Sequence, residues 1–250
     1  MGLSFRVVLV LLLTAGVHPV SAKVNYVDSP ALSKTSPATV TACDGAGTVQ
    51  VPIITWGADM ATILANGNSA TTAEGSIFAK QGLKLRLVRE DVFANQVNSF
   101  LACKSPYLRG TLGMMHIAAD VTETDPRTRL VVIHQLSWSA GGDALVVKSG
   151  INRPSDLRGK TIALQAYGPH IDYLAKVLRD GGLSLKDVKI RWTKDLTGTD
   201  QSPRSALYDP DVHAAMAIIP DALALTSQGK VGTGAEDSVK GARILLSTKT

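Results

Sequence analysis

The chain has 250 residues, and its 26 Lys and Arg residues against 21 Asp and Glu residues give a formal net charge of +5. The positive residues are scattered, and aromatic residues make up only 5% of the chain. Nucleic-acid binding, which needs a focused basic surface, therefore has little support. The length allows one large domain or two modest lobes, each with a real core.

The first 22 residues have the pattern of a cleavable secretory signal. Arg6 supplies the positive charge, residues 7–17 form an apolar run, and Val20, Ser21 and Ala22 form a small-residue cleavage site. The run is too short to cross a bilayer, which takes about 20 apolar residues. We therefore predict a signal peptide over residues 1–22 and export of the rest of the chain.

Residues 23–50 are rich in Ser, Thr, Ala and Pro and lack a sustained apolar period. We interpret them as a flexible lead-in to the folded part. Cys43 lies in this segment, and Cys103 ends a predicted helix. In an oxidising compartment the two cysteines can form a disulfide bond, and the alternative of two separate thiols stays open.

Residues 51–142 predict a first lobe in which strands and helices alternate, as in a mainly parallel α/β sheet. Its predicted elements are a strand at 51–56, a helix at 77–81, a strand at 83–88, a helix at 93–103 and a buried strand at 130–136.

The glycine pair at residues 141 and 142 marks the predicted crossing between lobes, because glycine tolerates backbone angles that other residues avoid. Residues 143–250 then predict a second lobe. Its elements are strands at 144–148, 160–165, 188–192, 214–219 and 242–247, a short capped helix at 154–157, and helices at 169–179 and 221–227.

Ligands of open α/β sheets bind beyond the carboxyl ends of the strands, so polar and aromatic residues that follow a strand are candidate contacts. Trp56 and Asp59 follow the first strand, and Asp195 follows the strand at 188–192. Asp221 follows the strand at 214–219, although a helix N-cap is an equally good reading of that residue.

Three further segments offer candidate ligand contacts. Thr111 and Met114 lie in a glycine-punctuated loop, which is either a ligand loop or an ordinary turn with Met114 in the core. Trp138 and Ser139 flank the inter-lobe glycines, where hinge residues touch ligand or merely connect. A strand-to-helix corner, where free N–H groups favour anions, holds the last candidates: Gln165, Tyr167, Gly168 and His170. The alternative is that Tyr167 and His170 only cap the helix.

No constellation for catalysis is recognisable in the sequence. The motifs of serine hydrolases, P-loop enzymes and zinc proteases are absent, and the histidines are dispersed. We therefore predict no catalytic residue, no metal ligand and no cofactor.

Residues 151–190, INRPSDLRGKTIALQAYGPHIDYLAKVLRDGGLSLKDVKI, carry a family resemblance. The segments DLRGKTIAL and GLSLKDVKI, and more loosely DPDVHAAMAIIPDALAL, are similar to the second lobe of periplasmic solute-binding proteins of ABC importers. The similarity is to the nitrate, sulfonate and thiamine-precursor subgroup and covers roughly residues 51–248. His213 stands where the family commonly has an acidic residue.

The resemblance implies an α/β fold of the two-lobed type II periplasmic binding protein class. It also implies a periplasmic receptor that closes over a small polar or anionic solute and docks onto an inner-membrane ABC permease. The alternatives are an envelope sensing or cell-wall-associated module without a permease, and a thiamine-precursor-type enzyme. Members of the family recross to the first lobe, so the resemblance implies a truncated chain here, with any wall-binding domain missing.

Overall fold

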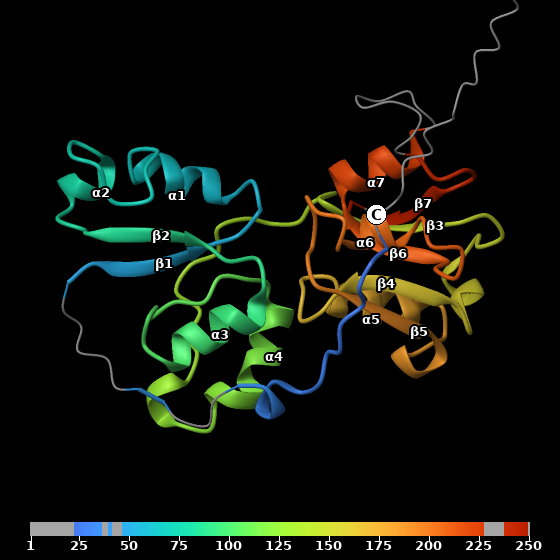
Figure 1. Cartoon of the computed structure of the whole chain (residues 1–250), viewed down its shortest axis with the longest axis horizontal. Coiled ribbons are helices and arrows are strands. Elements are labelled where there is room, and N and C mark those ends of the chain that lie inside the picture. Colours follow the sequence, from blue (N-terminus) through green and yellow to red (C-terminus); the bar gives the residue numbers. More distant parts are fainter. Residues whose placement is uncertain (1–22, 37–39, 42–46, 228–237, 250) are drawn as a thin grey trace, which may run out of the picture.

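The computed structural model describes residues 23–36, 40–41, 47–227 and 238–249. The predicted signal peptide and Cys43 lie outside these residues. The signal peptide and the disulfide bond between Cys43 and Cys103 therefore stay predictions. Figure 1 shows two groups of elements, each built around its own sheet with helices on both sides. We call the group around the two-stranded sheet lobe 1 and the group around the five-stranded sheet lobe 2.

Lobe 1 is built on two parallel strands, β1 (Val49–Ile53) and β2 (Leu85–Arg89), paired from Val49 with Leu85 to Ile53 with Arg89. Its remaining elements are α1 (Asp59–Ala65), α2 (Ile77–Lys80), α3 (Phe93–Leu101), α4 (Leu112–Thr122), and the 3-10 helices η1 (Leu32–Lys34) and η2 (Pro126–Thr128).

The core of lobe 1 forms between α3, α4 and η1. Phe93, Val97 and Leu101 recur every four residues on α3, so they share one helix face and are buried. Leu32 of η1 packs into the same cluster and is 1% exposed. The sequence pattern predicted α3 but not α4, because apolar residues surround much of α4 and give it little periodic contrast.

The predicted buried strand at 130–136 is wrong. No described element pairs with this segment, and the exposed fractions of its side chains are 79% for Val131, 66% for Val132 and 73% for Ile133. A continuous apolar run predicts burial only where another layer covers it, and the described residues provide no such layer.

Lobe 2 contains five strands in the order β5-β4-β6-β3-β7. Strand β4 is parallel to both β5 and β6, whereas β3 is antiparallel to β6 and β7, so this sheet is mixed. The strands are β3 (Asp143–Val147), β4 (Thr161–Gln165), β5 (Lys189–Thr193), β6 (Ala214–Ile218) and β7 (Arg243–Ser247). The helices are η3 (Pro154–Leu157), α5 (Ile171–Asp180), η4 (Leu185–Asp187), α6 (Pro203–Ala206) and α7 (Ile219–Thr226).

Both faces of the lobe 2 sheet are covered, which explains why all five residues of β3 are buried. Leu145 and Val147 pack on the side of α5, whereas Ala144 and Val146 face α7, because successive strand residues point to opposite faces. Every predicted strand of lobe 2 is present, with end points that differ by at most one residue.

The beginning of the predicted flexible lead-in is packed against the rest of the chain. Val24 is 7% exposed in the core beside α7, and Val27 forms an antiparallel bridge with Trp192 at the outer edge of β5. Leu32, a few residues later, is in the core of lobe 1. Single apolar residues that each enter an existing core have no periodicity, so the sequence pattern does not reveal them.

Candidate ligand-binding site

A cleft of about 610 Å³ lies between the two lobes. Small-molecule sites have volumes of roughly 300–1,000 Å³, so this cleft suits a small solute. Lobe 1 contributes the carboxyl ends of β1 and β2 with the loop into α1, and lobe 2 contributes the start of α7. The lining residues are Ile53, Ile54, Thr55, Trp56, Gly57, Asp59, Met60, Ile63, Arg89, Ala140, Gly141, Gly142, Ile218, Ile219 and Pro220.

Trp56 forms part of the cleft wall and reaches the segment that joins the lobes. Its Nε1 donates a hydrogen bond of 2.7 Å to Ser137 Oγ. Its ring lies against Gly142 so closely that a Cβ atom on that glycine would be 2.5 Å from Trp56 Cη2. The indole is therefore held by both a polar and a steric contact.

Asp59 also lines the cleft, but its carboxylate is already engaged. The side chain is buried, Oδ2 accepts the backbone N–H of Ile54 at 2.9 Å, and Oδ1 pairs with Arg109 Nε at 2.9 Å. These bonds fix the loop between β1 and α1. The predicted contact residue is thus at the cleft, where it shapes the wall.

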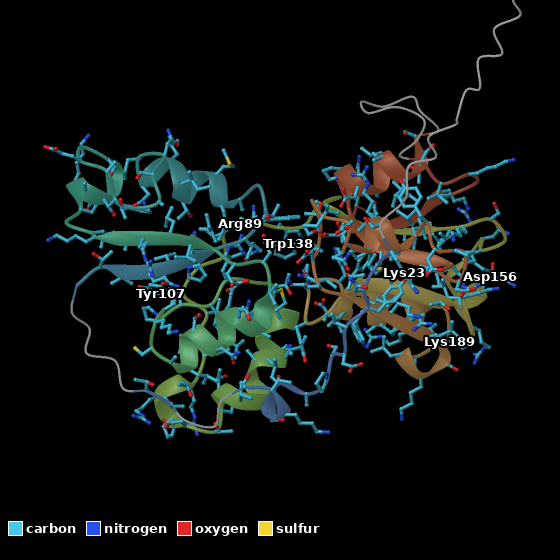
Figure 2. All side chains as sticks on the ribbon, in the orientation of Figure 1. Lys23, Arg89, Tyr107, Trp138, Asp156 and Lys189 are labelled. Atoms are coloured by element: carbon cyan, nitrogen blue, oxygen red, sulfur yellow. The ribbon has the colours of Figure 1, made fainter. Side chains whose placement is uncertain are left out.

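Arg89 brings positive charge to the cleft. It is the last residue of β2, and its side chain is 73% exposed. Arg89 Nε forms an ion pair with Asp91 Oδ2 at 3.0 Å, and the same carboxylate accepts the N–H of Thr55 at 2.6 Å and its hydroxyl at 2.9 Å. Asp91 therefore positions two cleft residues at once, and Figure 2 shows Arg89 and Trp138 where the two lobes meet.

The sequence rules missed Arg89 and Thr55, although a usable signal was present. The predicted strand at 83–88 ends directly before Arg89, so the argument from carboxyl strand ends that selected Trp56 applies equally to Arg89. Met60 and Ile63 lie on α1, which the pattern did not predict.

A polar network connects the crossing segment to lobe 2. Asp143 accepts hydrogen bonds from Ser139 Oγ and from His170 Nε2, the latter at 2.8 Å. Burial by itself would raise the pKa of Asp143, but the bonds with His170 and Ser139 outweigh it and lower the pKa below its usual value of 3.8. The carboxylate is thus kept ionised and holds the crossing segment in place.

Two buried polar atoms close to Asp143 have no hydrogen-bond partner among the described residues. They are Nδ1 of His170 and the hydroxyl of Tyr173. Burial, and secondarily the charge of Asp143, raise the pKa of Tyr173 to about 12. Ser139 bonds to the carboxylate and not to the imidazole, so these residues lack the serine-to-histidine contact of a hydrolytic triad.

The predicted ligand loop at 165–170 makes contacts between the lobes. Gln165 is buried, and its Nε2 donates to the backbone oxygens of Asp91 at 2.9 Å and Lys194 at 3.3 Å. The hydroxyl of Tyr167 donates to the oxygen of Pro30 at 2.7 Å. Gly168 is required here, because a Cβ atom would lie 2.6 Å from Gln165 Oε1. None of these residues, nor His170, lines the cleft.

The two predicted carboxylates of lobe 2 make structural hydrogen bonds: Asp195 within its own loop, and Asp221 from α7 to the loop that follows β5. Asp195 Oδ2 accepts the hydroxyl of Thr199, and Asp221 Oδ2 accepts that of Thr197, both at 2.7 Å. Asp221 lies within the first turn of α7, whose N-cap is Ile218, so the N-cap reading of Asp221 is wrong. The start of α7 lines the cleft, but these two side chains do not.

The remaining predicted contacts are also structural. Thr111 is the N-cap of α4, and its hydroxyl oxygen accepts the N–H of Met114 at 3.2 Å. Met114 is 4% exposed in the core of lobe 1. His213 accepts the N–H of Thr161 through Nδ1 at the amino ends of β4 and β6, away from the cleft.

Within the residues that the structure describes, no three His, Cys, Asp or Glu side chains group as a metal site would require. The same residues contain no helix with the length and apolar character needed to cross a membrane.

No protein-family model matches the sequence, and no curated protein matches it either. Solved structures do match. The alkanesulfonate-binding protein SsuA from Xanthomonas axonopodis pv. citri, bound to MOPS, superposes with a TM-score of 0.53 and 18% identity over 86% of this chain. The periplasmic aliphatic sulphonate binding protein SsuA from Escherichia coli superposes with a TM-score of 0.52 and 15% identity over 81% of this chain.

These similarities confirm the predicted fold class. The chain has the two-lobed α/β fold of periplasmic binding proteins, with sheets flanked by helices. It spans 62% and 61% of the lengths of the two sulfonate-binding proteins.

Proposed function

We propose that this chain is the solute-binding component of an ABC importer, exported to the periplasm by the predicted signal peptide. It captures a small polar or anionic solute between its two lobes and presents it to an inner-membrane permease. The observation that carries the proposal is the inter-lobe cleft, which lies at the carboxyl ends of β1, β2 and β6 beside the crossing segment. Two-lobed receptors close because a ligand contacts both faces at once.

The cleft chemistry favours an anion with an apolar part. Arg89 is the cationic residue among those that line it, and its ion pair with Asp91 is made through Nε. The outer nitrogens of the guanidinium are then available to oxygens of a sulfonate or carboxylate. Ile53, Ile63 and Ile219 supply apolar wall for the rest of such a solute.

We propose binding without turnover. The Ser139, Asp143 and His170 network is the strongest cluster of reactive side chains near the cleft, yet its serine bonds to the carboxylate, and its histidine is 1% exposed. A nucleophile that lacks a base and a base that lacks access to a substrate do not support covalent or acid–base catalysis.

A thermal-shift screen of alkanesulfonates, nitrate, sulfate and amino acids tests the proposal. A solute present at 100 times its Kd stabilises the folded state by about 2.7 kcal/mol. For a chain of this size that corresponds to a Tm increase of roughly 5–10 °C. If none of these solutes shifts Tm and calorimetry detects no binding, the proposed function is wrong.

Arg89→Ala tests the assigned anchor, with Arg86→Ala as its control. Both residues are on β2 and both substitutions remove one positive charge, but Arg86 bonds to Gln50 and does not line the cleft. Loss of a charged hydrogen bond to the solute costs about 1.5–3 kcal/mol, or roughly 10- to 150-fold in Kd. Equal Kd values for the two variants would show that Arg89 does not bind the solute.

The permease partner separates this proposal from the alternative of a sensing module that binds solute alone. Neighbouring genes for a permease and an ATPase favour the importer. Their absence, together with solute binding by the purified protein, favours the sensor.

A further inference from the structure

The segment from Val24 to Ser33 is attached to both lobes, and we call it the strap. It precedes β1 and contributes no residue to the cleft. The crossing segment before β3 is the other chain connection between the lobes within the described residues. Figure 1 shows the strap as the blue chain that runs from the five-stranded sheet to the region of α4.

The first half of the strap is anchored on lobe 2. Val24 is buried in the core beside α7, and the N–H of Val27 donates to the oxygen of Trp192 at 3.0 Å, which forms a single antiparallel bridge at the edge of β5. Between them, the hydroxyl of Tyr26 donates to Asp209 Oδ2 at 3.0 Å, and the guanidinium of Arg191 lies 5.2 Å from its ring centroid. These are apolar, backbone, polar and cation–π contacts.

The second half of the strap is anchored on lobe 1. Leu32 is 1% exposed in the cluster formed by α3 and α4. The N–H of Ser33 donates to Asp120 Oδ2 on α4 at 2.9 Å, and this bond lowers the pKa of Asp120. A loose tail would not bury a leucine this completely.

Tyr167 fastens the middle of the strap, where it passes between the lobes. This lobe 2 residue packs against the lobe 1 core, and its hydroxyl donates to the oxygen of Pro30. Its backbone has φ of +55°, in the left-handed region that a non-glycine residue occupies at a cost. Such backbone strain persists only where surrounding contacts hold the residue in place. Tyr167 does not line the cleft, and its hydrogen bond to the strap is one of the contacts that hold it.

The length of the strap sets a limit on lobe movement. Val27 on lobe 2 and Leu32 on lobe 1 are five residues apart, and five extended residues reach at most about 17 Å. We propose that the strap restrains the opening of the lobes, so that wide opening requires the strap to detach from one of them. Its importance for solute exchange rests on the proposed function, whereas the restraint itself does not.

Lengthening the strap tests the restraint without any solute. Insertion of Gly-Ser-Gly-Ser between Pro30 and Ala31, after the last lobe 2 anchor, keeps every anchor and raises the limit between Val27 and Leu32 to about 30 Å. Spin labels on non-natural residues at the exposed positions Lys80 of α2 and Lys186 of η4 report the distance between the lobes. We expect a longer and broader distance distribution than in the wild type. An unchanged distribution overturns the proposal.

Tyr167→Phe tests the central fastening, with Tyr107→Phe as its control. Tyr107 is a half-exposed tyrosine of lobe 1 that lies off the strap. The loss of one hydrogen bond raises the population of detached strap roughly two- to tenfold, which hydrogen exchange at the Val27 N–H measures directly. Equal exchange in the two variants contradicts the role of Tyr167. If no solute binds but both strap tests succeed, the proposed function fails and the restraint stands.

Discussion

Replacement of Gly142 by alanine forces a steric conflict in the wall of the cleft. The new Cβ atom would lie 2.5 Å from Trp56 Cη2. Carbon atoms in contact are separated by about 3.5–4.0 Å, so one group must move by about 1 Å. Overpacking of this kind costs about 1–3 kcal/mol, and loss of the Trp56–Ser137 hydrogen bond adds about 0.5–1.5 kcal/mol. The expected decrease in Tm is roughly 3–15 °C.

Gly57→Ala is the matched control, because Gly57 lines the same cleft and a Cβ atom there would have nothing within 4 Å. We expect its stability to change by no more than about 0.5 kcal/mol. Urea unfolding of Gly142→Ala, Trp56→Leu and the double variant completes a double-mutant cycle. Leucine leaves room for the new methyl group, so the double variant should be more stable than the sum of the single effects. If Gly142→Ala behaves like Gly57→Ala, or the two costs simply add, the contact does not constrain Trp56.

Two further predictions concern stability and solubility. Because the pKa of Asp143 is lowered by folding, the unfolded chain binds more protons in acid, and the contribution of this carboxylate is lost as the pH falls below 3.8. Asp143→Asn should therefore be less stable than the wild type at pH 7 by about 1–3 kcal/mol but lose less stability on acidification to pH ~3, as measured by urea unfolding at both pH values. Ile133→Lys, at a site that is 73% exposed, should reduce aggregation in light scattering and leave Tm unchanged; a fall in Tm would show that Ile133 is packed.

The sequence predicts lobe 2 more fully than lobe 1 for a physical reason. The lobe 2 strands other than β5 contain short apolar runs, β5 alternates polar and apolar residues, and α5 has an apolar stripe with a glycine at its C-cap, so local pattern and burial agree. In lobe 1 the run at 130–136 has the same local pattern without a layer to cover it. An apolar run in the sequence indicates a tendency to be buried. Whether it is buried depends on packing against another element, which the local sequence does not specify.

The sequence predicts the candidate site only to the extent that it predicts where the strands end. The rule that ligands bind beyond carboxyl ends selects Trp56 and Asp59, and both line the cleft. The same rule also selects Asp195 and Asp221, whose carboxylates instead accept hydrogen bonds from threonine hydroxyls of the loop after β5. The position of a residue relative to a strand end predicts where its backbone lies. The direction of its side chain depends on hydrogen-bond partners that are distant in the sequence, as with Tyr167 and Pro30.

The hydrogen bonds of two serines decide where the molecule can bend. Ser137 is tied to lobe 1 through the indole of Trp56, and Ser139 is tied to lobe 2 through Asp143 and lies 2.9 Å from the hydroxyl oxygen of Thr248. The glycine pair that follows is clamped as well, since Thr248 Oγ1 accepts the N–H of Gly141 at 3.1 Å. Trp138 lies between these two sets of bonds and its side chain is 79% exposed, so we expect a swing of one half of the molecule against the other to use its backbone torsions.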